Sequence, residues 1–118
     1  MIKIALNKLR PADLATLNDA ICLYSQYLTF FSLTEPGQNA FIYKSIAVEL
    51  EYVMAGRLKV RRVPQASLLN LEIHQGFILQ NSLQHYIGHT RNDLERARSY
   101  RLLERINKML PSIAEANQ

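Results

Sequence analysis

Proline and glycine divide this sequence into long uninterrupted stretches, and their positions constrain the fold more than any other feature. Pro11, Pro36 and Pro64 each precede such a stretch, and the fixed backbone angle of proline suits the first turn of a helix. Gly56 and Gly88 lie at the ends of two stretches, where a helix commonly closes on glycine. The pattern therefore predicts helices joined by short loops.

A further stretch follows Gly88. Thr90 and Asp93 have the spacing of a capping box, which opens a helix, and Pro111 marks where that helix should stop. The sequence therefore predicts four helices, over about 11–33, 37–56, 65–88 and 91–110.

Apolar side chains recur within each stretch at the spacing of one helix face. These expected core positions are Leu14, Leu17, Ile21, Tyr24, Leu28, Phe31, Ile42, Ile46, Leu50, Val53, Met54, Leu69, Ile73, Gly76, Leu79, Leu83, Ile87, Leu102, Ile106, Met109 and Leu110. Gly76 in the third helix predicts a close approach of a neighbouring helix, since glycine there otherwise costs about 1 kcal/mol relative to alanine. Antiparallel helices with short loops predict an all-α fold, an up-down-up-down four-helix bundle that forms one domain over 1–118.

Two short segments depart from the helical spacing. The segments MIKIAL and RLKVRRV both alternate apolar residues with other residues, which is typical of strands. We expect a two-stranded β ribbon of about 2–6 and 58–63 that closes one end of the bundle. The alternative is that both segments are extended connectors, because isolated pairs of strands are marginally stable.

Composition narrows the class of protein. Apolar residues make up 48% of the chain and charged residues 20%, as in an ordinary globular domain. The single cysteine, Cys22, excludes an internal disulfide and a cysteine-rich zinc cluster. Lys3, Lys8 and Arg10 interrupt the N-terminal segment, which argues against a signal peptide, and the apolar run AICLYSQYLTFFSL is too short to span a bilayer. We expect a cytoplasmic protein without a membrane segment.

The three histidines, His74, His85 and His89, fall on one face of the helix expected over 65–88, within about 60° of one another. His74 and His85 are separated by about 16 Å along the axis, so one ion cannot bind both. His85 and His89 form a four-residue pair, but zinc needs at least one further ligand, and no acidic residue of this helix has the spacing. The histidine face lies opposite the apolar face. Solvated surface histidines are therefore favoured, and no metal is expected.

No other feature indicates catalysis. The sequence contains none of the motifs GxGxxG, GxxxxGK[ST] and GxSxG. Cys22 lacks the cationic neighbours that would stabilise a thiolate, and Glu49 and Glu51 lie about 200° apart on their helix. We therefore expect no catalytic residue and no cofactor, and an enzyme is the weaker hypothesis.

Apolar residues also lie outside the core positions, on the first two helices and, as Leu71 and Ile78, among the histidines of the third. Large apolar patches are rare on monomers and mark partner surfaces, where aromatic residues are enriched. The leading hypothesis is a non-catalytic protein–protein interaction module that self-associates as a homodimer or binds a helical partner. The expected interface residues are Leu23, Tyr27, Phe30, Phe41, Val48 and Tyr52. The alternative is that loops and termini cover these side chains.

Basic residues gather in two places, and the net charge is +4. The first patch lies at the end of the second helix and comprises Arg57, Lys59, Arg61 and Arg62. The second lies on one face of the last helix and comprises Arg91, Arg98, Arg101, Arg105 and Lys108. We expect phosphates to be able to reach both patches. The alternative function is therefore nucleic-acid binding through both patches. Against it, Glu95 and Glu104 stand at helical spacing to pair with the arginine face, as on a solvated helix surface.

Overall fold

The computed structural model describes residues 3–34, 38–58 and 66–110. Four helices and one antiparallel pair of strands make up this part of the chain. The elements in chain order are β1 (Lys3–Leu9), α1 (Pro11–Thr34), α2 (Gln38–Leu58), β2 (Ser67–Glu72), α3 (Ile73–His89) and α4 (Asp93–Met109). The expected four-helix fold with a short two-stranded ribbon is confirmed. None of the helices in these ranges is both long and apolar enough to cross a membrane.

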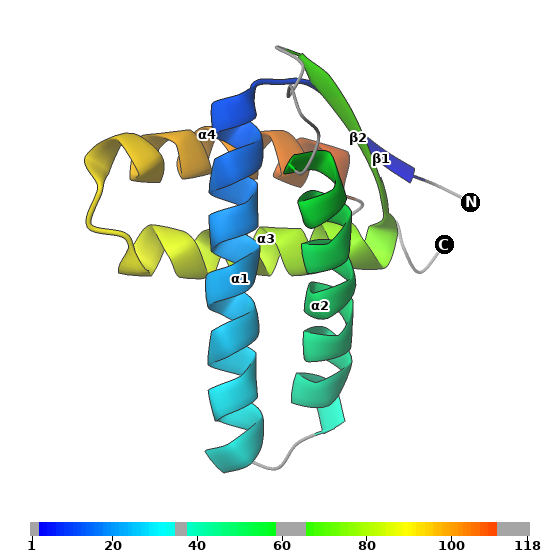
Figure 1. Ribbon diagram of the computed structural model, residues 1–118, viewed down its shortest axis with the longest axis vertical. Helices are drawn as coiled ribbons and strands as arrows, with labels where there is room; N and C mark the ends of the chain where they lie inside the picture. Colours follow the sequence, from blue (N-terminus) through cyan, green and yellow to red (C-terminus); the bar gives the residue numbers. More distant parts are fainter. Residues whose placement is uncertain (1–2, 35–37, 59–65, 111–118) are drawn as a thin grey trace.

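The helices form two antiparallel hairpins that cross each other. α1 and α2 lie side by side, and α3 and α4 run across them (Figure 1). α3 contacts the other three helices and both strands, so it is the centre of the fold. The four helices therefore do not share one axis, as they would in a regular up-down-up-down bundle.

The ribbon differs from the sequence-based expectation in its second strand. β1 covers most of the expected segment 2–6, but its partner is Ser67–Glu72, whereas 59–65 lie outside the described residues. The helix predicted over 65–88 is wrong for the residues of β2, and α3 begins only at Ile73. Leu69 and Leu71 pair with Leu6 and Ile4 of β1 and point into the core, and this pairing stabilises a strand where helical spacing was also compatible.

A β-bulge at Lys8 shapes the end of β1. The register shifts between Leu6 and Leu9, and Lys8 has a φ of 53°, in the left-handed region. Strict alternation would point Leu9 away from the core, since it stands three residues after Leu6. The extra residue turns Leu9 inward, and its side chain is fully buried.

Polar side chains cap the starts of α1, α3 and α4. Pro11 begins α1, and the Asp13 carboxylate accepts the backbone N–H of Arg10 at 3.0 Å. Glu72 and Gln75 form a reciprocal capping box at the start of α3. Asn92 caps α4 by accepting the N–H of Glu95 at 3.0 Å. These caps satisfy backbone donors that a helix start leaves without partners.

The last helix begins two residues later than expected. Thr90 does not cap it but follows the end of α3, and Arg96 fixes the corner between the two helices. The Arg96 guanidinium donates to the carbonyl oxygens of Ile87 at 3.3 Å and Thr90 at 2.6 Å. Carbonyls at a helix end need such donors, so this arginine is committed to the turn.

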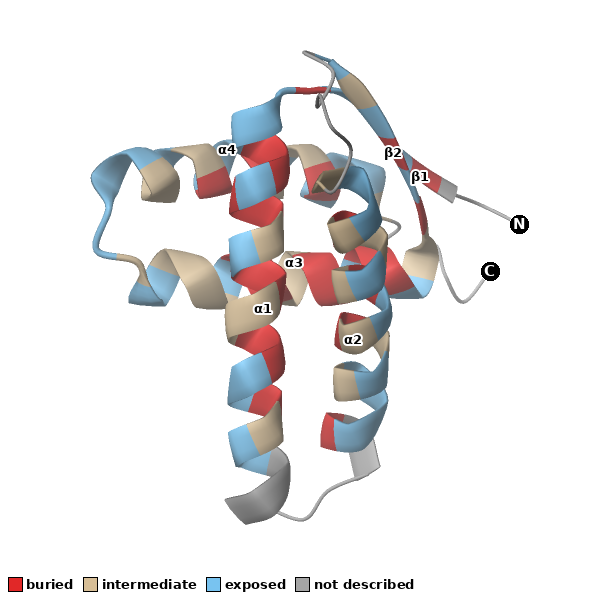
Figure 2. Cartoon of the chain, viewed as in Figure 1, coloured by how far each residue is buried: buried red, intermediate tan, exposed pale blue. Residues whose placement is uncertain are grey.

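One hydrophobic core connects all six elements, and Figure 2 shows its buried residues concentrated where α1 and α2 cross α3. The core residues are Ile4, Leu6, Leu9, Leu14, Leu17, Ala20, Ile21, Tyr24, Leu28, Ala47, Leu50, Met54, Leu69, Leu71, Ile78, Leu79, Leu83, Leu102 and Ile106. Phe31, Ile42 and Met109, which we expected in the core, are exposed. α2 buries the small Ala40 and Ala47 instead, which lets its backbone approach its neighbours closely.

The opposite error occurs at two residues that we expected on the outer face of the third helix. Leu71 and Ile78 are buried, at 1% and 2% exposure. Leu71 faces inward because it belongs to β2. Ile78 is buried because α3, which touches every other element, buries more of its circumference than a helix with one packed face.

Gly76 marks a close approach, as expected, but a strand makes it. A Cβ added to Gly76 would overlap Cδ1 of Ile4 in β1 and lie 3.1 Å from Cδ2 of Leu110. Glycine at this position therefore allows β1 to pack directly on the first turn of α3.

Candidate functional site

His74 lies apart from the other two histidines of α3. His74 is half-exposed and lies 3.8 Å from the carboxylate of Glu49 on α2. His85 and His89 stack with their ring centroids 4.0 Å apart. His89 Nδ1 donates to the carbonyl oxygen of His85 at 2.7 Å, so that nitrogen is not available to a metal. Within the described ranges, no three His, Cys, Asp or Glu side chains come together as metal ligands would.

His85 packs against tyrosines of α1. Its ring lies 5.7 Å from Tyr24 and 4.7 Å from Tyr27, centroid to centroid. Both ring nitrogens are buried, and neither has a hydrogen-bond partner among the residues that the structure describes. This burial, with a smaller contribution from His89, lowers the pKa of His85 below its ordinary value of 6.5.

The lowered pKa of His85 predicts a loss of stability in acid. The unfolded chain takes up the His85 proton at higher pH than the folded protein, so the full stability is present above pH 6.5 and decreases as the pH falls below it. We expect the melting temperature to be lower at about pH 5.5 than at about pH 7.5, and His85→Phe to remove part of that difference. His74→Gln is the control, and an unchanged pH dependence in His85→Phe would contradict this cause.

The thiol of Cys22 lies in a setting that disfavours the reactive thiolate. It is half-buried, and Sγ lies 3.9 Å from Oδ1 of Asn18. Burial, followed by the carboxylates of Glu51 and Asp19, raises the pKa of Cys22. The described neighbours of this thiol therefore disfavour a nucleophilic thiolate.

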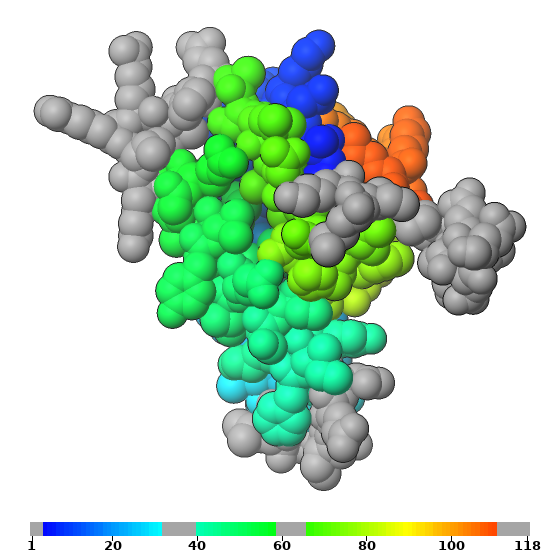
Figure 3. All heavy atoms as spheres, turned by 90° about the vertical axis from the view of Figure 1, so that its right-hand side faces the viewer, coloured from blue at the N-terminus to red at the C-terminus, as the bar shows by residue number. Residues whose placement is uncertain are grey.

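The expected interface residues of α2 share one exposed face. Phe41 and Tyr52 are 62% and 77% exposed, and Val48 is half-buried between them. Together with Ala55 they form the α2 stripe, which spans about 60° of the helix on the side opposite the buried Leu50. Val48, Glu51, Tyr52 and Ala55 also line a groove of about 280 Å³. Figure 3 shows α2 open to solvent over much of this side of the molecule.

The expected interface residues of α1 lie on a different side of the hairpin. Tyr27 is 42% exposed and faces His85 of α3. α1 turns another side to α2, where Thr29 accepts a hydrogen bond from Lys44, and Thr29 stands about 200° from Tyr27 around the axis. Leu23 and Phe30 share the side of Tyr27. The six expected interface residues therefore form two separate groups, one on each helix.

The two basic patches differ in how their residues are placed. Arg57 is exposed at the end of α2, whereas Lys59, Arg61 and Arg62 lie outside the described residues. On α4 the cations already have partners: Lys108 lies 3.3 Å from Glu104, and Arg105 donates to the carbonyl oxygen of Asn7 at 2.7 Å. Arg91 is exposed in the loop before α4. The face does not present a row of unpaired cations.

Arg98 and Arg101 converge on a buried carboxylate at the start of α1. The side chain of Asp13 is fully buried, and Arg101 donates to its Oδ1, which lies 3.9 Å from Nε of Arg98. Arg98 also donates to the hydroxyl of Thr16 at 3.2 Å and lies 3.7 Å from Glu95. Asp13 therefore orients two arginines of α4 while it caps α1.

These arginines border a pocket that the sequence does not reveal. Arg10, Leu94, Ala97, Arg98 and Arg101 line a space of about 350 Å³ between the start of α1 and the first half of α4. Neither Arg10 nor Asp13 was among the expected site residues. The spacing of Asp13 from Arg10 suits a helix cap, but no local pattern joins Asp13 to Arg101, which is 88 residues away.

Comparison of the chain with protein-family models, with curated proteins and with solved structures finds no match. The groove on α2 and the arginine pocket are therefore the features of this chain that indicate a function.

Proposed function

We propose that this protein is a non-catalytic protein–protein interaction module that forms a homodimer through the α2 stripe. The observation that carries the proposal is the exposure of Phe41 and Tyr52 on one face of α2, beside a groove. Exposed aromatic side chains around a concave surface are typical of partner surfaces. We further propose a cytoplasmic location, where the Cys22 thiol would remain reduced.

The position of Val48 suits a two-fold axis. α2 runs from Gln38 to Leu58, and Val48 is its central residue. If two copies pack their α2 helices antiparallel with the axis beside Val48, each residue faces the one equally far beyond Val48 on the other copy. Phe41, seven residues before Val48, then faces Ala55 of the partner subunit, seven residues after it. Such mutual contact is the rule at two-fold interfaces.

The groove offers a place for the Phe41 ring. It is lined by Val48, Glu51, Tyr52 and Ala55, and the small Ala55 leaves room beside the Tyr52 ring. A ring from the second copy would bury apolar surface of both subunits, and each interface would contain this contact twice. This pairing of a large ring with a small residue favours a second copy over an unrelated partner.

Sedimentation equilibrium at tens of micromolar tests the dimer. We expect a mass of twice 13.6 kDa for the wild-type chain. Tyr52→Glu and Phe41→Glu should each weaken the dimer about a hundredfold or more, because the new carboxylate would be buried without a partner. Circular dichroism should show unchanged helix content in both variants.

The matched control is Tyr100→Glu. Tyr100 is 57% exposed on α4, so the substitution adds the same charge at a similarly exposed ring away from the α2 stripe. We expect this variant to remain a dimer. A wild-type chain that sediments as a monomer, or a Tyr100→Glu variant that dissociates like Tyr52→Glu, would exclude the α2 interface.

A further inference from the structure

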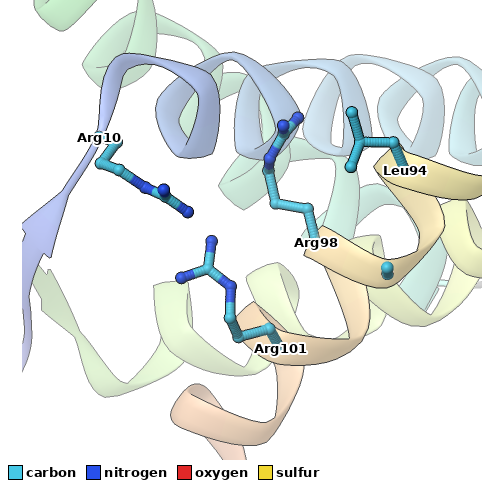
Figure 4. Close-up of a pocket in the computed structure, with 5 residues that line it drawn as sticks. Arg10, Leu94, Arg98 and Arg101 are labelled. Atoms are coloured by element: carbon cyan, nitrogen blue, oxygen red, sulfur yellow. The ribbon is translucent and has the colours of Figure 1, made fainter.

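The arginine pocket combines two regions of the chain that are far apart in sequence. Arg10 lies between β1 and α1, whereas Arg98 and Arg101 stand one turn apart on α4. Figure 4 shows the guanidinium groups of Arg10 and Arg101 pointing toward each other across the pocket, with Arg98 beside them. Like charges that face each other across an open space favour an anion between them.

The nearby carboxylates do not neutralise this cluster. Three arginines line the pocket, and the carboxylates within 4 Å of them are Asp13 and Glu95, so one positive charge remains in excess among the described residues. Each guanidinium has five N–H donors, and Asp13 and Thr16 engage only some of them. Asp13 lies fully buried behind the arginines, so it holds their side chains in place without filling the pocket.

We propose that this pocket binds a phosphate group. The planar fork of arginine matches a phosphate with two parallel hydrogen bonds, and three such forks provide more donors than a carboxylate can accept. The open space of about 350 Å³ exceeds a phosphate group in size, so a group attached to the phosphate can extend along α4. Leu94 and Ala97 provide an apolar wall for that group.

The phosphate can come from two sources. One is the phosphodiester backbone of a nucleic acid, whose next phosphate would reach Arg105, one turn beyond Arg101, where the guanidinium also donates to the carbonyl oxygen of Asn7. The other is a phosphomonoester of a small molecule, whose remaining part would contact Leu94 and Ala97. Both use the same three guanidinium groups.

Isothermal titration of the purified protein with sodium phosphate, at constant ionic strength, tests the site. We expect a dissociation constant of about 1 mM or lower for phosphate and no measurable binding of acetate or chloride. Arg10→Gln should weaken phosphate binding about tenfold, because it removes one charged fork. The side chain of Arg10 is 65% exposed, and the backbone N–H that Asp13 accepts remains, so this variant keeps the cap of α1.

Lys108→Gln is the matched control, because it removes one positive charge from the exposed end of α4. It should change phosphate binding less than twofold. Arg101→Lys, which keeps the charge beside Asp13 but loses the fork, should behave like Arg10→Gln. Absence of phosphate binding, equal binding of acetate, or equal losses in Arg10→Gln and Lys108→Gln would each overturn the phosphate site.

Two further titrations identify the source of the phosphate. Tighter binding of a single-stranded oligonucleotide than of inorganic phosphate, with the same loss in Arg10→Gln, would assign the site to nucleic acid. Tighter binding of a nucleoside monophosphate, with the same loss, would assign it to a phosphomonoester. The Tyr52→Glu variant should bind phosphate as the wild type does, so failure of the dimer and failure of the phosphate site can be told apart.

Discussion

Replacement of Asp13 by alanine is expected to lower the free energy of unfolding by about 3 kcal/mol. The Asp13 side chain is fully buried, and its carboxylate lies close to both Arg98 and Arg101. Without the Asp13 carboxylate, the guanidinium groups of Arg98 and Arg101 repel each other and lose the negative charge that attracts them to α1. The substitution also removes the cap on the Arg10 N–H, which contributes about 1 kcal/mol at a helix start.

The partial exposure of the arginines limits this loss. The Arg98 side chain is 18% exposed and that of Arg101 is 45% exposed, so Arg101 can turn toward water when Asp13 is absent. We therefore expect a loss at the lower end of the range of about 3–5 kcal/mol that broken buried ion pairs show. A domain of ordinary stability would lose a large part of its total of about 5–15 kcal/mol.

Asp93→Ala is the control for Asp13→Ala in urea unfolding. Asp93 pairs with Arg96 at 3.1 Å, but its side chain is 94% exposed, so its removal should cost about 1 kcal/mol or less. Asp13→Asn should fall between the two, because the amide oxygen still accepts the Arg10 N–H while the charge is lost. Equal stability of Asp13→Ala and Asp93→Ala would show that the buried ion pairs contribute little.

The sequence predicts α1 and α2 well because local signals agree there. Pro11 begins α1, and the buried Leu14, Leu17 and Ile21 follow helical spacing from that start. The end of α2 shows the limit of such signals. Gly56 predicted a C-terminus, yet α2 continues to Leu58, since glycine permits a helix end without requiring one.

The two candidate sites differ in how far local sequence patterns could predict them. The α2 stripe could be predicted because Phe41, Val48 and Tyr52 lie on one helix, and their exposure follows from its wheel. The arginine pocket could not, because the partners of Arg98 and Arg101 lie at the start of α1. Helical spacing suggested Glu95 as a partner of Arg98, and that pair is present at 3.7 Å, but the buried Asp13 was missed.

Helical periodicity mispredicts the segment before α3 for a related reason. Leu69 suits either a helix continuous with Leu79 and Leu83 or a strand in which it alternates with exposed residues. Periodicity alone does not separate these structures over six residues. Pairing with β1 decides between them, and the paired residues of β1 lie 58 to 69 positions earlier in the chain.

Substitution of Leu71 by alanine separates the strand from the helix experimentally. In β2, Leu71 is 1% exposed and pairs with Ile4, so its truncation leaves a cavity in the core. We expect a loss of about 2–5 kcal/mol in the free energy of unfolding, measured with urea. If the segment were the start of a helix continuous with α3, Leu71 would lie on the side of His74, which is exposed, and its truncation would cost little.

Leu68→Ala is the matched control for Leu71→Ala, because it removes the same atoms from the same strand. Leu68 is 47% exposed and alternates with the inward Leu69, so we expect a change within about 0.5 kcal/mol. The two substitutions therefore test the alternation itself, since side chains an odd number of residues apart point to opposite faces of a strand. Losses of similar size at Leu68 and Leu71 would contradict the strand β2. A large loss at Leu71 alone would support the pairing of Leu71 with Ile4 in β1, whose side chain also packs against Gly76 of α3.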